Sequence, residues 1–414
     1  MASATPSAFR SPAEIAKAAI ESFLTSSTQS ELIEPGDPAI SVDPARLQLS
    51  LSGRWLILEA WDKDNFLTRR ITEVRSEQPG RLELRTERFG GRPGVLILVD
   101  SARPRNLGVR RKADRQVFGA MFRRMLYREF PGWRIVELST EANLEESLSP
   151  SFPRAMLRRG AACWAAMAAP PSARADELLT FGLIWLDYLR RRERKALVEG
   201  LALFVPHGRH ITLWTRLPHL NHASATYKAF TYDAEGRLVR LDPADTGNFD
   251  TRMLLPPPET AFALEPEALI EMQLRNEIDQ LDPRLTPAPV YGQVGGVTAV
   301  ERGMLDLLAV DVAGRLYVIE IKASESLQLP LQALDYWIRV KWQAANGDFA
   351  KYGYFPGIAL SAAAPRILLV APALEFHPAN ERVLRYLDPS IEVETIGIAH
   401  GWGAPVRVLF RRPR

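Results

Sequence analysis

The chain has 414 residues, of which 46% are hydrophobic and 24% charged, and its formal net charge is +3. Two or three globular domains fit this length, and the composition excludes a chain that is disordered throughout. No apolar run approaches the roughly 20 residues of a membrane span, and no basic segment followed by an apolar one marks a secretory signal at the start. Because the lone Cys163 has no partner within the chain, we expect a cytoplasmic protein.

The first part of the chain is expected to hold a polar tail and an α+β domain. Residues 1–45 form the tail, with one short helix in which Ser11 is the N-cap and Pro12 the first helical residue. The domain, residues 46–255, is expected to contact nucleic acid. Its predicted strands are residues 47–51, 54–59, 81–85, 94–99, 179–185, 198–205, 211–215 and 229–232, and its predicted helices are residues 113–127 and 151–167. A proline-rich linker, residues 256–264, marks the predicted domain boundary.

Basic residues concentrate between positions 101 and 200, where 19 Lys and Arg stand against 11 Asp and Glu. Such side chains neutralise phosphates, and interleaved aromatic rings can stack on unpaired bases. The three-to-four spacing of Phe118, Phe122 and Leu126 favours instead the buried stripe of an amphipathic helix, with the arginines on its solvated face. Under both interpretations the candidate nucleic-acid-binding residues are Arg110, Arg111, Lys112, Arg123 and Arg124.

Four of the six histidines form two His-x-x-His pairs, which invites a zinc interpretation. Structural zinc sites usually include cysteine, and closure by histidines alone is uncommon. Prolines and a glycine beside the pairs favour loop ends whose histidines are solvated or bind phosphate. The residues concerned are His207, His210, His219 and His222.

The strongest chemical signal is a predicted hairpin near the C-terminus. Asp306 lies on the strand at residues 304–311, and Glu320 and Lys322 lie on the strand at residues 316–322. Side chains alternate along a strand, so Glu320 and Lys322 share a face, and the turn brings Asp306 beside Glu320. Ionised groups in so apolar a run are costly unless a cation or a partner compensates them. The plain alternative is a cross-strand salt bridge on a half-exposed hairpin.

Two predicted helices flank this hairpin. The first, residues 267–282, presents Glu267 and Glu271 on one face, and the strand at residues 289–294 follows it. The second, residues 329–342, places Gln332 and Tyr336 four residues apart, within reach of the strand acids.

This order of a helix, a strand, an Asp strand, a Glu-x-Lys strand and a Gln-x-x-x-Tyr helix resembles the PD-(D/E)XK nuclease superfamily. Within it, residues from about 265 to 414 look most like RecB-type and archaeal single-strand endonuclease domains. Leu305 stands where the name of the motif has proline. The resemblance implies an α/β fold, with a restriction-endonuclease-like C-terminal domain whose mixed central sheet is flanked by helices, joined to the N-terminal α+β domain.

The resemblance also implies a Mg²⁺-dependent endonuclease that hydrolyses phosphodiester bonds of DNA in repair, restriction or defence. Asp306, Glu320 and the main-chain carbonyl of Ile321 would bind Mg²⁺, for which Mn²⁺ can substitute. Lys322 would orient or deprotonate the water, Glu267 or Glu271 would complete the site, and Gln332 and Tyr336 would position DNA or the lysine. A homodimer is among the assemblies implied. Two alternatives stay open: a non-catalytic nucleic-acid-binding protein on a retained nuclease fold, and a scaffold for an acidic partner.

A second Asp and Glu pair occurs upstream, at Asp187 and Glu199, on two predicted strands. It suggests a degenerate nuclease copy that kept the scaffold. Leu201 stands where the lysine would be, so we expect no catalysis there, and chance is the simpler explanation of so short a pattern.

Overall fold

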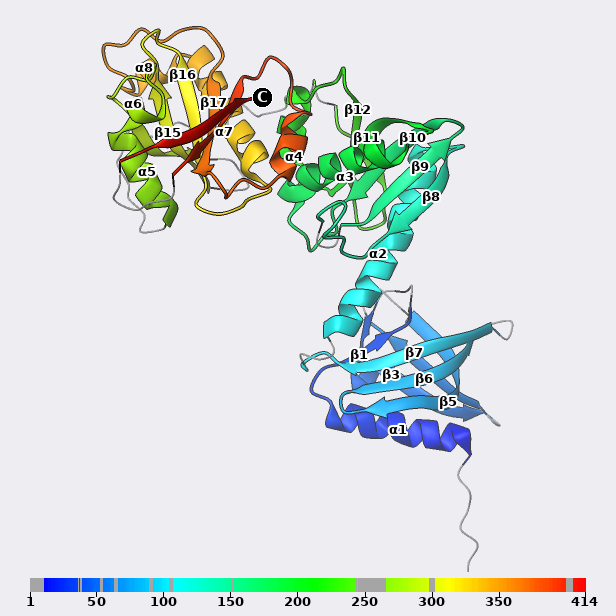
Figure 1. Ribbon diagram of the computed structural model, residues 1–414. Coiled ribbons are helices and arrows are strands. Elements are labelled where there is room, and N and C mark those ends of the chain that lie inside the picture. Colours follow the sequence, from blue (N-terminus) through cyan, green and yellow to red (C-terminus); the bar gives the residue numbers. More distant parts are fainter. Residues whose placement is uncertain are drawn as a thin grey trace, which may run out of the picture. The chain divides into compact units, whose positions relative to one another are not determined.

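The computed structural model describes residues 11–35, 37, 39–52, 55–62, 66–88, 92–103, 107–149, 152–242, 244, 266–297, 302–399 and 405–414. The chain forms two compact units, Met1–Arg128 and Glu129–Arg414. Three sheets are built from the described strands, one in the first unit and two in the second (Figure 1).

The first unit is an antiparallel sheet with a helix across one face. The strand order is β2-β1-β7-β6-β5-β4-β3, and the buried residues of helix α1 pack against it. Ser11 caps α1 as predicted: its hydroxyl accepts from the Glu14 amide, and the Glu14 carboxylate accepts from the Ser11 amide. The elements are α1 (Pro12–Ser26), β1 (Ser30–Ile33), β2 (Ile40–Ser41), β3 (Leu47–Ser52), β4 (Trp55–Trp61), β5 (Phe66–Gln78), β6 (Arg81–Arg88), β7 (Arg92–Asp100) and α2 (Leu107–Glu129).

The second unit begins with a six-stranded mixed sheet, here called the β8–β13 sheet. Its first three strands form an antiparallel meander, the next two run parallel to the third, and the last is antiparallel. Helices α3 and α4 make the two crossovers. The elements are β8 (Arg134–Ser139), β9 (Arg154–Arg159), β10 (Ala162–Ala168), α3 (Leu178–Arg192), β11 (Leu197–Pro206), α4 (Ile211–Arg216), β12 (Thr226–Tyr232) and β13 (Leu238–Arg240).

The second mixed sheet of this unit, the β14–β19 sheet, carries the predicted hairpin. Its strands lie in sequence order, antiparallel from β14 to β16, parallel from β16 to β18, and antiparallel between β18 and β19. Helices α7 and α9 make its crossovers. The elements are α5 (Pro266–Asn276), α6 (Ile278–Leu281), β14 (Tyr291–Val297), β15 (Arg302–Val310), β16 (Leu316–Ile321), α7 (Leu329–Ala345), α8 (Asp348–Lys351), β17 (Arg366–Pro372), α9 (Ala379–Leu384), β18 (Val393–Ile398) and β19 (Val408–Pro413).

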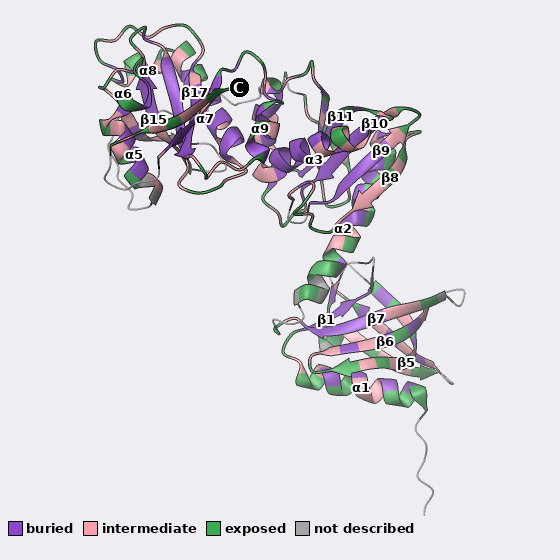
Figure 2. Ribbon diagram, viewed as in Figure 1, coloured by how far each residue is buried: buried purple, intermediate pink, exposed green. Residues whose placement is uncertain are grey.

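One hydrophobic core joins the two sheets of the second unit. Its buried residues include Trp185 on α3 and Trp337 on α7, and it continues through α4 and α9. Figure 2 shows the central strands of both sheets and much of α3 and α7 buried. No helix among the described residues is both long and apolar enough to cross a membrane.

Three predicted elements of the middle region are wrong. Residues 151–167, predicted as a helix, form the β9–β10 hairpin. Residues 179–185 and 211–215, predicted as strands, lie in helices α3 and α4. Residues 179–185 are buried throughout, so neither helical nor strand periodicity marks them. Residues 211–215 are only partly buried, and residues 151–167 span two strands and the exposed turn between them, so their patterns do not fit one regular element.

The boundary between the two compact units does not coincide with the proline-rich linker, where the sequence predicted it. The division falls between Arg128 and Glu129, and residues on both sides of the linker share the core of the second unit. The linker itself, residues 256–264, lies outside the described residues. Residues 30–33 and 40–41, expected within a polar tail, are strands of the first sheet.

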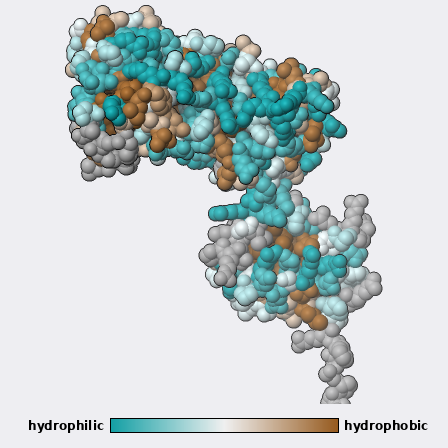
Figure 3. Space-filling view, in the orientation of Figure 1, coloured by the Kyte–Doolittle hydropathy of each residue, from teal (hydrophilic) through white to brown (hydrophobic). Residues whose placement is uncertain are grey.

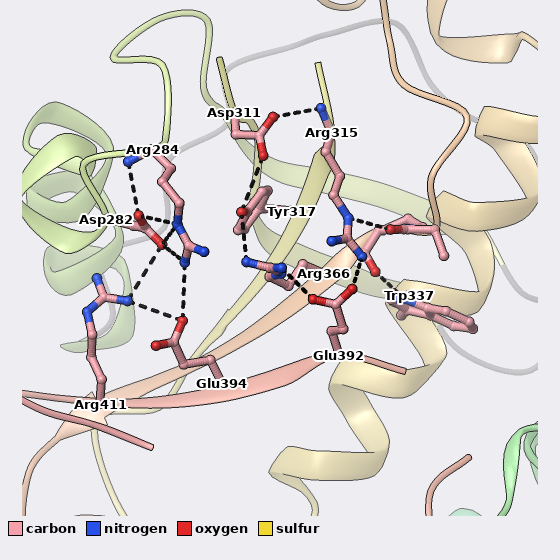
Figure 4. A network of polar contacts seen from close by, with 12 residues as sticks. Asp282, Arg284, Asp311, Arg315, Tyr317, Trp337, Arg366, Glu392, Glu394 and Arg411 are labelled. Atoms are coloured by element: carbon pink, nitrogen blue, oxygen red, sulfur yellow. Dashed lines mark hydrogen bonds and ion pairs between the residues drawn. The ribbon is translucent and has the colours of Figure 1, made fainter. Parts of the chain in front are cut away.

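A polar network closes the end of the β14–β19 sheet that lies at the hairpin turn (Figure 4). Asp282, whose side chain is 2% exposed, accepts hydrogen bonds from Arg284 and lies 3.6 Å from a guanidinium nitrogen of Arg411. Farther across the sheet Glu392 bridges Arg315 and Arg366. Because these pairs join β16, β17, β18 and β19, the network fixes the sheet without using Asp306 or Glu320.

Replacing Asp282 by Asn should lower the stability of the second unit and change its pH dependence. Burial acts to raise the pKa of Asp282, but the hydrogen bonds and charges of Arg284 and Arg411 outweigh it, so this pKa is lowered. Its contribution is therefore complete above the unfolded pKa, near 4, and is lost as pH falls through the folded pKa. We expect a loss of about 3 kcal/mol at pH 7 that shrinks towards pH 3 in urea titrations. If the loss of stability in Asp282→Asn were the same at every pH, the lowered pKa of Asp282 would not be its cause.

Candidate active site

The hairpin brings the predicted acids together. Leu307 pairs with Ile319, which places Asp306 and Glu320 opposite each other on β15 and β16. One carboxylate oxygen of Asp306 accepts a hydrogen bond from the Ile321 amide at 2.7 Å. Glu320 is fully buried, whereas Asp306 keeps partial exposure. The strand alternation read from the sequence therefore holds, and both acids face the same region of the sheet.

Lys322 stands among the oxygen atoms of this region. Its Nζ lies 3.3 Å from Glu320 Oε1, 3.1 Å from the carbonyl oxygen of Ile321 and 3.4 Å from Glu267 Oε2. Three oxygens from a strand side chain, a main chain and a helix thus converge on one ammonium group. Lys322 pairs with Glu320 as the plain alternative allowed, but the two residues belong to the same segment of chain, so this ion pair does not bridge the two strands.

The other carboxylate oxygen of Glu320 is buried and has no hydrogen-bond partner. Leaving a buried acceptor unsatisfied costs about 1–3 kcal/mol, and more for a charged group. Burial, followed by the charge of Asp306, raises the pKa of Glu320 well above its ordinary value. Burial likewise raises the pKa of Asp306 to about 6. The two acids thus hold protons more strongly than isolated carboxylates do, which is the behaviour of a site short of positive charge.

Lys322 keeps its own proton. Burial acts to lower the pKa of this lysine, but Glu320, Asp306 and Glu267 together raise it. In this arrangement Lys322 is therefore a cation that partly compensates the acids.

The two helix candidates that the sequence left open both lie near the hairpin acids, because the charges of Glu267 and Glu271 both act to raise the pKa of Asp306. Glu267, on α5, reaches Lys322. Glu271, one turn later, is buried and lies against β14, where a Cβ atom at Gly292 would come within 2.3 Å of its carboxylate. Sequence reasoning did not single out Gly292, although a glycine inside a strand often marks such a close approach. Of the two acids, Glu267 is in ionic contact with the hairpin lysine.

The predicted helix pair also lies at the site. Gln332 and Tyr336 lie one turn apart and share one face of α7. Burial and then the charge of Glu320 raise the pKa of the Tyr336 hydroxyl, so this phenol stays neutral beside the acids. Gln332 and Tyr336 thus form the α7 wall of the site.

The donor set can be compared with what Mg²⁺ requires. No group of three or more acidic, histidine or cysteine side chains in the described part of the chain is arranged to hold a metal ion directly. Mg²⁺ is commonly held by only one or two carboxylates and keeps several waters. Two carboxylates, one of them with an orphaned buried oxygen, and a main-chain carbonyl therefore fit this ion.

The predicted nucleic-acid-binding residues lie on α2 of the first unit. Phe118, Phe122 and Leu126 are buried, which confirms the amphipathic interpretation of this helix. Arg111, Lys112, Arg123 and Arg124 are exposed, and the part of α2 in view in Figure 3 is hydrophilic. The side chain of Arg110 lies outside the described residues.

The two histidine pairs make separate contacts. His207 and His210 stack on each other with ring centroids 5.9 Å apart. The ring of His222 bonds the carbonyl of Leu217, and the ring of His219 meets Trp337 edge-on.

Comparisons with known proteins add little to this geometry. No family model matches the chain, and no curated protein matches it. Among solved structures, the chain is similar to the crystal structure of a repair endonuclease from Pyrococcus abyssi, with 10% identity over 92% of this chain and 96% of that chain. The TM-score is 0.22, and at that value the similarity carries no argument about fold or activity.

Proposed function

We propose that the protein is a Mg²⁺-dependent nuclease that hydrolyses phosphodiester bonds of DNA. The observation that carries the proposal is the fully buried Glu320 with its unpartnered oxygen, opposite Asp306 and beside Lys322. A stable hairpin has no structural need for such an acid, since an apolar residue there would avoid the cost of burial. A divalent cation would compensate both carboxylates.

Asp306, Glu320 and the carbonyl of Ile321 would hold the ion. When bound, Mg²⁺ supplies an acidified water and neutralises charge on the phosphate under attack. The side chains of Lys322 and Glu267, which are 13% and 38% exposed, would move aside as the ion enters. Lys322 would then orient the attacking water and offset the charge of the phosphate. Gln332 and Tyr336 would hold the lysine or the nucleic acid in position.

The test is cleavage of a panel of end-labelled substrates. Single-stranded, duplex, branched and mismatched DNA, with RNA counterparts, would be incubated with Mg²⁺, Mn²⁺ or a chelator. We expect cleavage of DNA with either metal and none with the chelator. Asp306→Asn should be inactive while retaining its circular dichroism spectrum and its binding to DNA. DNA binding without cleavage under every condition would instead support the non-catalytic alternative.

A further inference from the structure

The two sheets of the second unit have the same topology. Each is a meander of three antiparallel strands, followed by a helix, a parallel strand, a second helix, another parallel strand and a final antiparallel strand. In this correspondence α3 matches α7 and α4 matches α9. The chain order of the elements therefore repeats, although the sequence shows no repeat of fixed period.

Contacts between the two sheets repeat in the same way. Leu220, after α4, forms an antiparallel bridge with Leu387, after α9. The amide of Asn221 donates to the carbonyl of Tyr386 at 2.7 Å, and the amide of Asp388 donates to the carbonyl of His219 at 2.8 Å. Exchanging the two sheets converts the first hydrogen bond into the second, which is the property of a two-fold axis.

The helices follow the same reciprocity. Helix α3 packs on α9, and α4 packs on α7. Arg216 on α4 pairs with Asp335 on α7, while Arg382 on α9 lies 3.9 Å from Asp187 on α3. The second unit is thus built like a dimer of two similar halves within one chain.

Hydrogen bonds between strands give the residue correspondence. The amide of Lys322 donates to Val370 just after β16, and the amide of Ala169 donates to Phe204 just after β10. Ala169 therefore occupies the position of Lys322, and Met167, two residues earlier, that of Glu320. Across the meander, Arg154 pairs with Met167 and occupies the position of Asp306.

The β8–β13 sheet accordingly holds no acid at the three hairpin positions. The carboxylates near Arg154 are Glu137 and Glu146, and both have protein partners. Arg192 donates to Glu137 at 2.8 Å, and Tyr188 donates to Glu146 at 2.5 Å. The Asp187 and Glu199 pattern is not the counterpart: Asp187 lies in helix α3, and Glu199 is exposed on β11.

We propose that the second unit is an intramolecular pseudo-dimer with one metal centre, in the β14–β19 sheet, and that each chain consequently cuts one strand of its substrate. This inference rests on the proposed function. A duplex bound by a single chain would be released with one strand cut and the other strand intact.

Binding of Mn²⁺ to the full-length protein, measured by calorimetry at pH 8, tests the single centre without relying on activity. We expect all bound Mn²⁺ to be lost in Glu320→Gln and the full amount to be retained in the matched variants Glu137→Gln and Glu146→Gln. Mn²⁺ that remains bound in Glu320→Gln and disappears in Glu137→Gln or Glu146→Gln would overturn the inference while leaving the proposed function intact. A wild-type protein that binds no Mn²⁺ and cuts nothing would overturn both.

The number of cuts is read from a duplex carrying a different fluorophore on each strand, with protein in excess and the chain shown to be monomeric by light scattering. We expect each DNA molecule to lose one strand first. Simultaneous loss of both strands at the same rate would overturn the single-cut inference.

Discussion

Glu320→Gln is expected to abolish Mg²⁺-dependent cleavage, by about a thousandfold or more, while stabilising the metal-free protein. The two effects have one cause. The native carboxylate is fully buried with an orphaned oxygen, so it costs stability in the metal-free protein, and the proposed ion would compensate that cost. We expect a gain of about 1 kcal/mol in the free energy of unfolding at pH 8, measured with a chelator present.

The sign of this effect depends on pH. Because the pKa of Glu320 is raised in the folded state, the folded protein binds more protons than the unfolded one above about pH 4.3, and wild-type stability falls as pH rises. The gain in Glu320→Gln should therefore grow from pH 5 to pH 8 and disappear when Mg²⁺ is added. The exposed Glu325 offers the matched control, since Glu325→Gln should change neither activity nor stability. A destabilised Glu320→Gln protein would indicate a structural role for the acid.

Arg216→Met should cause the largest loss of stability in the second unit. This arginine is nearly fully buried, makes two hydrogen bonds of 2.7 and 2.8 Å to Asp335, and donates a third to the carbonyl of Asp176. Removing one partner of a buried pair leaves the other charge and its acceptors poorly compensated, which costs about 3 kcal/mol or more. Thermal unfolding should show a Tm lower by several degrees.

The other arginine–aspartate pair between the two halves is the control. Arg382 is 29% exposed, and its Nε lies 3.9 Å from Asp187, so Arg382→Met should cost less than about 1 kcal/mol. Equal losses in the two variants would mean that burial and geometry do not distinguish the pairs. Because neither residue contacts Asp306, Glu320 or Lys322 in the described structure, Mn²⁺ affinity should stay unchanged in both folded variants.

The hairpin was readable from the sequence because two local signals agree there. Alternation along residues 316–322 fixes which side chains share a face, and the turn before Gly314 fixes the strand that lies opposite. Both signals depend on residues that are neighbours along the chain. The contact of Lys322 with Glu267 could not be predicted in this way, because Glu267 and Glu271 are one turn apart and share a face of the helix. The packing of α5 on the sheet brings Glu267 to Lys322.

The middle region shows the opposite case. Residues 179–185 are buried on all sides, so their periodicity contains no information about strand or helix, and the prediction of a strand there is wrong. Residues 151–167 contain an exposed turn between two strands, and the prediction of one helix there is also wrong.

By itself, the sequence determined the mixed α/β character, the capped first helix, the amphipathic α2 and the acidic hairpin. Each of these follows from the spacing of apolar, capping or acidic residues that are close together in the chain. Only the tertiary structure decided that the β8–β13 sheet repeats the topology of the β14–β19 sheet and has Arg154 and Met167 where the other sheet has Asp306 and Glu320. That relation lies in hydrogen bonds between strands and helices far apart in the chain, and topology is conserved by backbone pairing whatever side chains the strands carry.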